Sequence, residues 1–174
     1  PPVEWQDKLS IDPGLNNPLS CHWYCRDFDG NVYVVAEHYE AKRDVAYHAE
    51  RIRRISEGLN WQSGRFGGIS ELNWHTDKFG RVEALMDSAA NQRTLNGQKS
   101  VAELFVAEGI DVNTRVNKDV YTGINKVKAM LKPLRGKPKL YIFSSCVNMI
   151  REIKGYFWGE NDSPIKKDDH AMDE

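Results

Sequence analysis

The sequence contains few cysteines, and their spacing does not suit a structural metal site. Cys21, Cys25 and Cys146 are the three present. Their number is odd, and no Cys-x2-Cys pair provides a zinc framework. Cys21 and Cys25 lie in a run of apolar and aromatic residues, which favours buried, reduced thiols. This cysteine usage is typical of a cytosolic protein.

The sequence also lacks long hydrophobic runs and a nucleotide-binding loop. No apolar stretch approaches the length of a membrane span, and no segment resembles a signal peptide. We therefore expect no association with a membrane. A Gly-x4-Gly-Lys-Ser/Thr phosphate loop is absent, so this segment alone should not hydrolyse ATP.

The remaining composition is that of one ordinary globular domain. The chain has 174 residues, of which 40% are hydrophobic and 28% are charged, enough to bury a core. The net charge of -1 does not exclude a nucleic-acid partner, because basic and acidic residues can be segregated on the surface. The chain begins with Pro1-Pro2, and we expect residues 1–174 to be a single domain from a longer protein.

Hydrophobic periodicity predicts strands in the first third of the chain. The expected strands are residues 9–11, 19–26 and 32–39, with an Asp-Gly-Asn hairpin turn at residues 27–31. The period then becomes helical from the predicted N-cap Asp44 to Gly58. We expect three consecutive antiparallel strands followed by a helix.

Strands and helices alternate in the second half. The expected strands are residues 82–86, 112–116 and 140–144, and the expected helices are residues 101–108, 120–131 and 147–157. The strand aromatics, Tyr141 and Phe143 among them, are expected in the core. This order predicts an α/β protein with a mixed sheet, three antiparallel strands followed by parallel ones, and helices on both faces.

Acidic residues follow the expected strands in a suggestive order. Asp12 ends the first strand, Asp87 ends a later buried strand, and Asp168-Asp169-His170, with Asp173 close behind, opens a last helix. Mg²⁺ prefers hard oxygen ligands, and two such ions can stabilise both oxygens of an in-line phosphodiester displacement. Clustered carboxylates of this kind are therefore typical of a metal site.

Each acidic position also has a simpler interpretation. Asp12-Pro13-Gly14 could be a plain turn, and Asp87 could be a helix cap. Asp168-Asp169 follows Lys166-Lys167 and could belong to a solvated charged segment. The joint order of the three positions, which matches the RNase H-like fold, favours the metal site.

Several tracts of the chain resemble a known family. They are Ile11-Asp12-Pro13-Gly14 with Asn17-Pro18, residues 30–39, Leu85-Met86-Asp87-Ser88-Ala89-Ala90, and residues 167–174. Together they resemble the nuclease domain of the large terminase subunit of tailed bacteriophages, which has an RNase H-like fold. The last tract resembles the Asp-His-x-x-Asp ending of that family but lacks the Arg-Tyr pair that normally follows.

The resemblance implies roles for the acidic residues. Asp12 and Asp87 match the family's first two metal-binding acids, and the third is Asp169 or Asp173. Asp169 is preferred because it lies at the expected helix start, so that Asp12, Asp87 and Asp169 become the catalytic carboxylates. Asp173 lies one turn later on the same helical face and could bind metal as well. Asp168 and His170 are auxiliary candidates.

The resemblance also implies an activity and its partners. We expect an endonuclease that cuts double-stranded viral DNA during packaging, in the host cytoplasm, with two Mg²⁺ or Mn²⁺ ions. The expected partners are an N-terminal ATPase domain of the same polypeptide, the portal protein and the small terminase subunit.

A basic stretch is the candidate DNA-binding surface. It contains Lys126, Lys128, Lys132, Arg135 and Lys137, whose charges could contact phosphates without reading bases. A solvated helix end and loop would look the same in the sequence.

Two alternatives remain open from the residues alone. The chain could be another RNase H-like nuclease, such as a RuvC-like resolvase or a transposase core, which would share the acids but cut a different substrate. It could also be a non-catalytic interaction module whose acids only form turns and caps.

Overall fold

A six-stranded mixed sheet forms the centre of the protein. The computed structural model describes residues 5–14, 17–59, 76–92, 99–116, 119–156 and 171. The strands are β1 (Gln6–Asp12), β2 (Leu19–Arg26), β3 (Val32–Glu40), β4 (Val82–Met86), β5 (Ile110–Asn113) and β6 (Leu140–Ile142). Their order in the sheet is β5-β4-β1-β2-β3-β6. β1, β2 and β3 pair antiparallel, whereas β4, β5 and β6 join in parallel, which confirms the expected mixed sheet.

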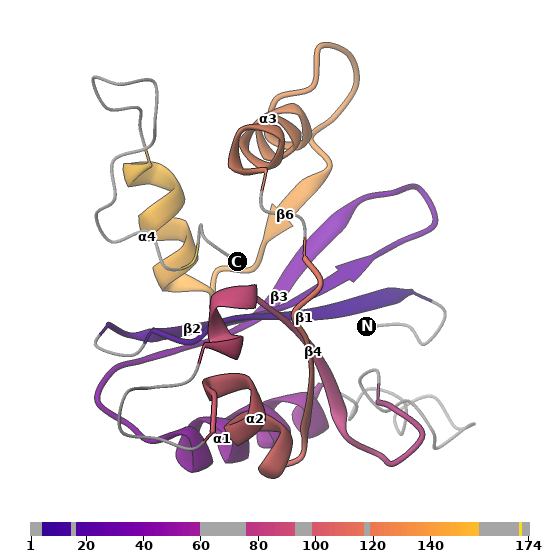
Figure 1. The fold of residues 1–174 in the computed structure, drawn as a ribbon. Coiled ribbons are helices and arrows are strands. Elements are labelled where there is room, and N and C mark those ends of the chain that lie inside the picture. Colours follow the sequence, from indigo (N-terminus) through magenta and orange to yellow (C-terminus); the bar gives the residue numbers. More distant parts are fainter. Residues whose placement is uncertain are drawn as a thin grey trace, which may run out of the picture.

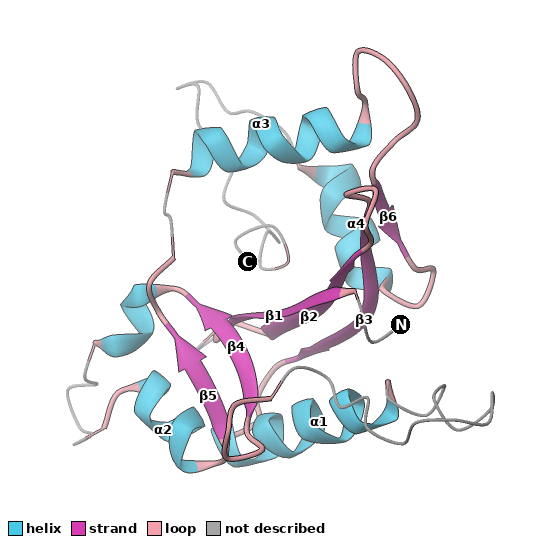
Figure 2. Cartoon of the chain, turned by 90° about the vertical axis from the view of Figure 1, so that its right-hand side faces the viewer, coloured by secondary structure: helices cyan, strands magenta, loops and turns pink. Residues whose placement is uncertain are grey.

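Helices cover both faces of this sheet. They are α1 (Val45–Gly58), the short 3-10 helix η2 (Ser88–Asn91), α2 (Val101–Ala107), α3 (Val120–Leu131) and α4 (Val147–Gly155). Figure 1 and Figure 2 agree that α1 and α2 lie on one face, which we call the lower face, and that α3 and α4 lie on the other, the upper face. None of the described helices is long and apolar enough to cross a membrane.

Local signals in the sequence explain where several elements begin. The Asp44 carboxylate accepts a hydrogen bond from the Tyr47 N–H at 2.8 Å, which confirms the predicted N-cap of α1. Asp27 accepts from the Asn31 N–H at 2.8 Å in the β2–β3 turn. The fifth strand begins at Ile110, directly after Gly109, and not at Val112 as predicted.

The lower face buries most of the apolar core. Leu9, Ile11, Trp23 and Phe105 are almost fully buried there, and the Trp23 indole N–H donates to Ser56 Oγ of α1 at 2.9 Å. Aliphatic and aromatic side chains of this size each contribute roughly 1.5–3 kcal/mol on burial. The α1 and α2 layer is therefore held mainly by the hydrophobic effect.

The upper face has a smaller apolar cluster. It contains Val34, Cys146, Met149 and Ala171, and none of the residues of α3 is buried. The expectation that the strand aromatics lie in the core is wrong for Tyr141 and Phe143, whose exposed fractions are 39% and 49%. β6 is short and lies at the sheet edge. The rings of Tyr141 in β6 and Phe143 directly after it therefore remain partly exposed to solvent.

A pair of histidines joins β3 to α1 inside the lower face. His38 Nε2 and His48 Nδ1 lie 2.9 Å apart, and both side chains are buried. Burial, and to a lesser extent the charge of nearby His48, lowers the pKa of His38 to about 4. Burial likewise lowers the pKa of His48. Both rings are therefore neutral at pH 7 in the folded protein.

The histidine pair predicts a loss of stability in mild acid. The unfolded chain takes up protons below the ordinary histidine pKa of about 6.5, whereas folded His38 does so only near pH 4. The free energy of unfolding should thus fall by about 2 kcal/mol for His38 alone between pH 7 and pH 5. Urea unfolding at several pH values measures this. The variant His38→Gln should flatten the profile, and an equally steep profile in the variant would contradict the assignment.

Candidate metal centre

Asp12 and Asp87 come together at the middle of the sheet. β1 and β4 are adjacent and parallel, and Ile11 of β1 is paired with Met86 of β4. Asp12 is the last residue of β1 and Asp87 directly follows the last residue of β4, and adjacent strands lie about 4.8 Å apart. Ile11 and Met86 are buried in the lower core, so strand alternation directs both carboxylates to the upper face. Both residues remain partly exposed.

The turn after Asp12 requires glycine. Gly14 has φ +37, and a Cβ at this position would lie 2.2 Å from the Pro18 carbonyl oxygen. A side chain would therefore displace the chain that connects β1 to β2. The positive φ of Gly14 and its close approach to Pro18 constrain the backbone that follows Asp12.

Asp87 caps the 3-10 helix η2. Its Oδ1 accepts a hydrogen bond from the Ala89 N–H at 2.5 Å. The capping interpretation of Asp87 is thus structurally correct. A carboxylate has about four acceptor positions, so capping orients Asp87 and is compatible with its binding a cation.

The donor chemistry of this pair fits a hard divalent cation. Two partly exposed carboxylates on adjacent rigid strand ends provide the oxygen ligands that Mg²⁺ or Mn²⁺ prefers. Within the described ranges, no group of three or more His, Cys, Asp or Glu side chains is arranged to hold a metal. The remaining candidates, Asp168, Asp169, His170 and Asp173, lie outside the described residues.

Comparisons with known proteins identify the family. The sequence matches the terminase RNaseH-like domain family over residues 9–173. This chain belongs to the terminase RNaseH-like domain family. A search of curated protein sequences gave no significant match.

Solved structures show the same fold for this terminase domain. It is similar to the nuclease domain of the P22 large terminase with a TM-score of 0.73 and 14% identity, covering 99% of this chain and 79% of that one. It is also similar to the large terminase from a thermophilic bacteriophage, with a TM-score of 0.68 and 20% identity. That match covers 99% of this chain and 39% of the thermophilic phage protein.

A buried carboxylate on β3 holds α4 on the terminase domain's sheet. Glu37 of β3 accepts hydrogen bonds from the Asn148 N–H at 3.0 Å, the Asn148 side-chain amide at 2.8 Å and the Met149 N–H at 2.8 Å. His22 Nε2 lies 3.0 Å from the same carboxylate. Burial raises the pKa of Glu37, but the hydrogen bonds from His22, Met149 and Asn148 outweigh it and bring the pKa to about 2.

Four polar residues of the terminase domain's upper face were not among the predicted site residues. His22, Glu37, Tyr39 and Glu152 are linked to other side chains of the upper face. Glu152 lies three residues after Met149 on the buried side of α4. A charged residue at this helical spacing from an apolar one indicates a buried charge, so the sequence carried a signal for Glu152. The partners could not be found in this way because they are distant in sequence.

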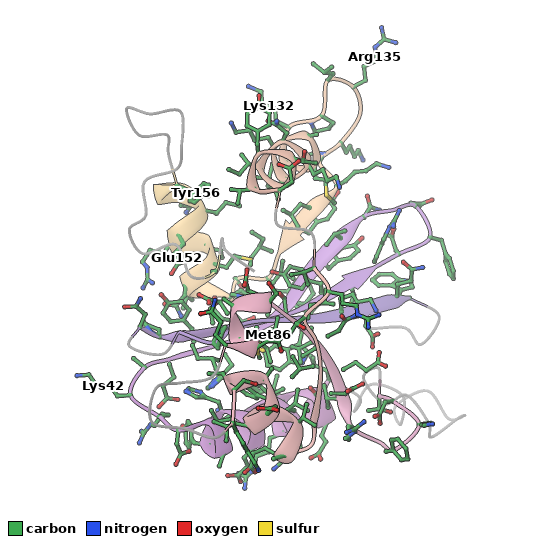
Figure 3. The ribbon with its side chains drawn as sticks, viewed as in Figure 1. Lys42, Met86, Lys132, Arg135, Glu152 and Tyr156 are labelled. Atoms are coloured by element: carbon green, nitrogen blue, oxygen red, sulfur yellow. The ribbon has the colours of Figure 1, made fainter. Side chains whose placement is uncertain are left out.

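Two of the predicted basic residues, Lys132 and Arg135, lie away from the strand end that precedes Asp87. Lys126, Lys128, Lys132, Arg135 and Lys137 are all exposed. In Figure 3, Lys132 and Arg135 lie at the outer side of α3 and its following loop, far from Met86, the residue before Asp87. Any DNA that contacts both regions must span the distance between them.

A groove lies between β1, β4 and β5 on the upper face. Its volume is 390 Å³, and its charged lining residues are Lys8, Glu83, Asp111 and Arg115. Lys8 precedes Asp12 by four residues of strand, or about 13 Å. Two acidic and two basic side chains balance one another, so charge alone does not draw a phosphate backbone into this groove.

Replacing Glu37 with glutamine should destabilise the terminase domain at neutral pH. The lowered pKa of Glu37 corresponds to a contribution of about 3 kcal/mol to the free energy of unfolding. This contribution is fully present above the ordinary glutamate pKa and is lost as the pH falls through 4.5 toward 2. The difference in unfolding free energy between wild type and Glu37→Gln should therefore shrink by about 2 kcal/mol from pH 6 to pH 3.

Urea unfolding of both proteins measures this difference. The matched control is Glu50→Gln, which breaks an exposed pair with Arg54 and should change stability by less than about 1 kcal/mol. If the difference in unfolding free energy between wild type and Glu37→Gln does not change with pH, the assignment of an ionised Glu37 is wrong.

Proposed function

We propose that this domain is a metal-dependent endonuclease that cuts double-stranded viral DNA during genome packaging. The observation that carries the proposal is the pairing of β1 with β4, which brings Asp12 beside Asp87 in a chain of the terminase RNaseH-like domain family. Membership of this family supports a nuclease of the packaging machinery. A non-catalytic module would not need two acids to converge at adjacent strand ends.

The proposed chemistry is hydrolysis assisted by two divalent ions. Asp12 and Asp87 would hold Mg²⁺ or Mn²⁺ from the strand ends, and Asp169, with Asp173 as the alternative, would complete the set. Bound ions of this kind stabilise charge on the attacking and leaving oxygens of a phosphodiester. The rigid backbone at Asp12 and the cap at Asp87 keep two of the carboxylates oriented before metal and DNA bind.

The proposed setting is a larger protein. The chain spans about two fifths of the large terminase from the thermophilic bacteriophage, of which structures with ADP and ATP-gamma-S exist. We propose that an ATPase domain of the same polypeptide moves DNA while this domain cuts it, together with a portal protein and a small terminase subunit.

The acids are tested by isosteric substitution. Asp12→Asn or Asp87→Asn should reduce Mn²⁺-dependent nicking of plasmid DNA by roughly 100-fold or more, since even indirect partners of a metal site contribute 10–100-fold. Asparagine also caps helices, so Asp87→Asn should keep its bond to Ala89.

The matched control for these variants is Asp111→Asn. Asp111 is paired with Glu83 near the amino-terminal ends of β5 and β4, away from the carboxyl ends that precede or carry the two aspartates, and its loss should leave nicking within a few-fold of wild type. Undiminished cutting by Asp12→Asn would refute the proposed site.

The basic stretch is tested through salt dependence. The triple variant Lys132→Gln, Arg135→Gln, Lys137→Gln should weaken binding to duplex DNA of any sequence. The slope of log affinity against log salt should fall by about one per lost phosphate contact. Lys42→Asn is the control, because Lys42 has φ +62, tolerated by asparagine, and lies far from Lys132 in Figure 3. An unchanged slope in the triple variant would exclude this surface.

A further inference from the structure

The segment that follows β5 leaves the sheet at the same edge as the two aspartates. Leu85 of β4 is paired with Asn113 of β5 in a parallel ladder, and the arrowheads of β4 and β5 lie side by side in Figure 2. Asp87 and Arg115 each come two residues after this pair. The strand order β5-β4-β1 therefore places the end of β4, which Asp87 follows, between Asp12 on one side and the segment with Arg115 on the other.

Two hydrogen bonds restrict the backbone of this segment. The side-chain amide of Asn91, at the end of the 3-10 helix that Asp87 caps, donates to Thr114 Oγ1 at 2.7 Å. The Arg115 N–H donates to Asn113 Oδ1 at 3.0 Å. The segment is thus tied both to itself and to the turn after β4. A side chain on a restricted backbone loses less conformational freedom when it binds a ligand.

Charges are separated along the groove between β1, β4 and β5. Its charged lining residues are Lys8, Glu83, Asp111 and Arg115. Glu83 and Asp111 are paired near the amino-terminal ends of their strands, and Lys8 lies at the same end, four residues before Asp12. In the described part of the chain, Arg115 is the one charged residue that lines the end beside the aspartates. The balanced total therefore consists of one acidic end and one basic end.

The two arginines near this groove differ in their partners. At the acidic end, the Arg81 guanidinium lies 2.6 Å from Asp77 Oδ2 and 3.7 Å from Asp111 Oδ1. Arg115 is exposed, and its side chain forms no ion pair with any acidic residue that the structure describes. A guanidinium can donate two parallel hydrogen bonds to a phosphate. Arg115 can therefore bind a phosphate without giving up an existing partner.

We propose that Arg115 binds a DNA phosphate next to the one that is cut. This inference rests on the proposed nuclease function, in which the phosphate that is cut lies at Asp12 and Asp87. Arg115 lies beyond Asp87 on the side away from Asp12, so it contacts the neighbouring phosphate of the same DNA strand. Glu83 and Asp111 repel phosphate from the other end of the groove, which keeps the strand at the carboxyl edge of the sheet.

The first test is the kinetics of Arg115→Gln in the 174-residue chain. A neighbouring phosphate is bound equally in the ground state and the transition state, so its loss acts on KM and not on kcat. The KM for Mn²⁺-dependent nicking of plasmid DNA should rise by about 10-fold or more, as expected for a hydrogen bond to a charged group, with kcat within about 3-fold of wild type. Arg115→Lys should recover part of this loss, because lysine keeps the charge without the two-pronged geometry.

The second test measures DNA binding without cutting. The affinity of a fluorescein-labelled duplex is measured by anisotropy at several salt concentrations, with Ca²⁺ in place of Mn²⁺. The slope of log affinity against log salt should fall by about one in Arg115→Gln. A role for Arg115 in folding alone would not change this slope.

The matched control is Lys8→Gln, which removes the same charge from the acidic end of the same groove. Lys8 is exposed, as Arg115 is, so both variants should unfold at the urea concentration of wild type. Lys8→Gln should leave KM within about 2-fold of wild type and the salt slope unchanged. An unchanged KM and slope in Arg115→Gln overturn the inference, and so does an equal effect of Lys8→Gln.

Failure of the proposed function gives a different result. Wild type would then not cut, or Asp12→Asn would cut as well as wild type, whereas the binding assay still reports whether Arg115 contacts DNA.

Discussion

A single buried carboxylate, Glu37, determines how the upper face of this domain is built. It receives two backbone N–H groups and one side-chain amide from the start of α4, and it lies against His22 of the neighbouring strand. An ionised side chain so deeply buried is stable only with this number of donors. Because α4 is fixed at Glu37, its later residue Glu152 lies within reach of Tyr39 and Ala171.

The two faces of the sheet are therefore stabilised by different forces. On the lower face, large apolar side chains such as Trp23 and Phe105 pack against α1 and α2. On the upper face the apolar cluster is small, and directional hydrogen bonds define the position of α4. Apolar packing tolerates some sliding of side chains, whereas a carboxylate with several donors specifies one arrangement. Directional hydrogen bonds therefore suit a face that presents two aspartates in a fixed geometry.

Much of the fold follows from local sequence patterns, and much of the upper face does not. The change from a two-residue to a helical period after Tyr39, with the cap Asp44, was sufficient to predict three strands and then α1. The order of Asp12 and Asp87 after their strands matched the RNase H-like fold and so favoured a shared metal site. The contacts of Glu37 with Asn148 and of Tyr39 with Glu152 could not be predicted, since they join distant elements with no shared period. Tyr141 was misplaced because periodicity does not show which strand is at the edge.

The pairing of β1 with β4 also affects how the domain folds. These central strands come from opposite sides of α1 in the chain, as the partners Ser10 and Leu85 show. Contacts between residues so distant in sequence form slowly, because a long loop must close before any pairing is gained. The hairpins of β1, β2 and β3 can form on the ribosome before β4 is available to pair with β1. The two aspartates become neighbours only after β4 has been synthesised and inserted beside β1, so a nascent chain cannot assemble this pair of acids early.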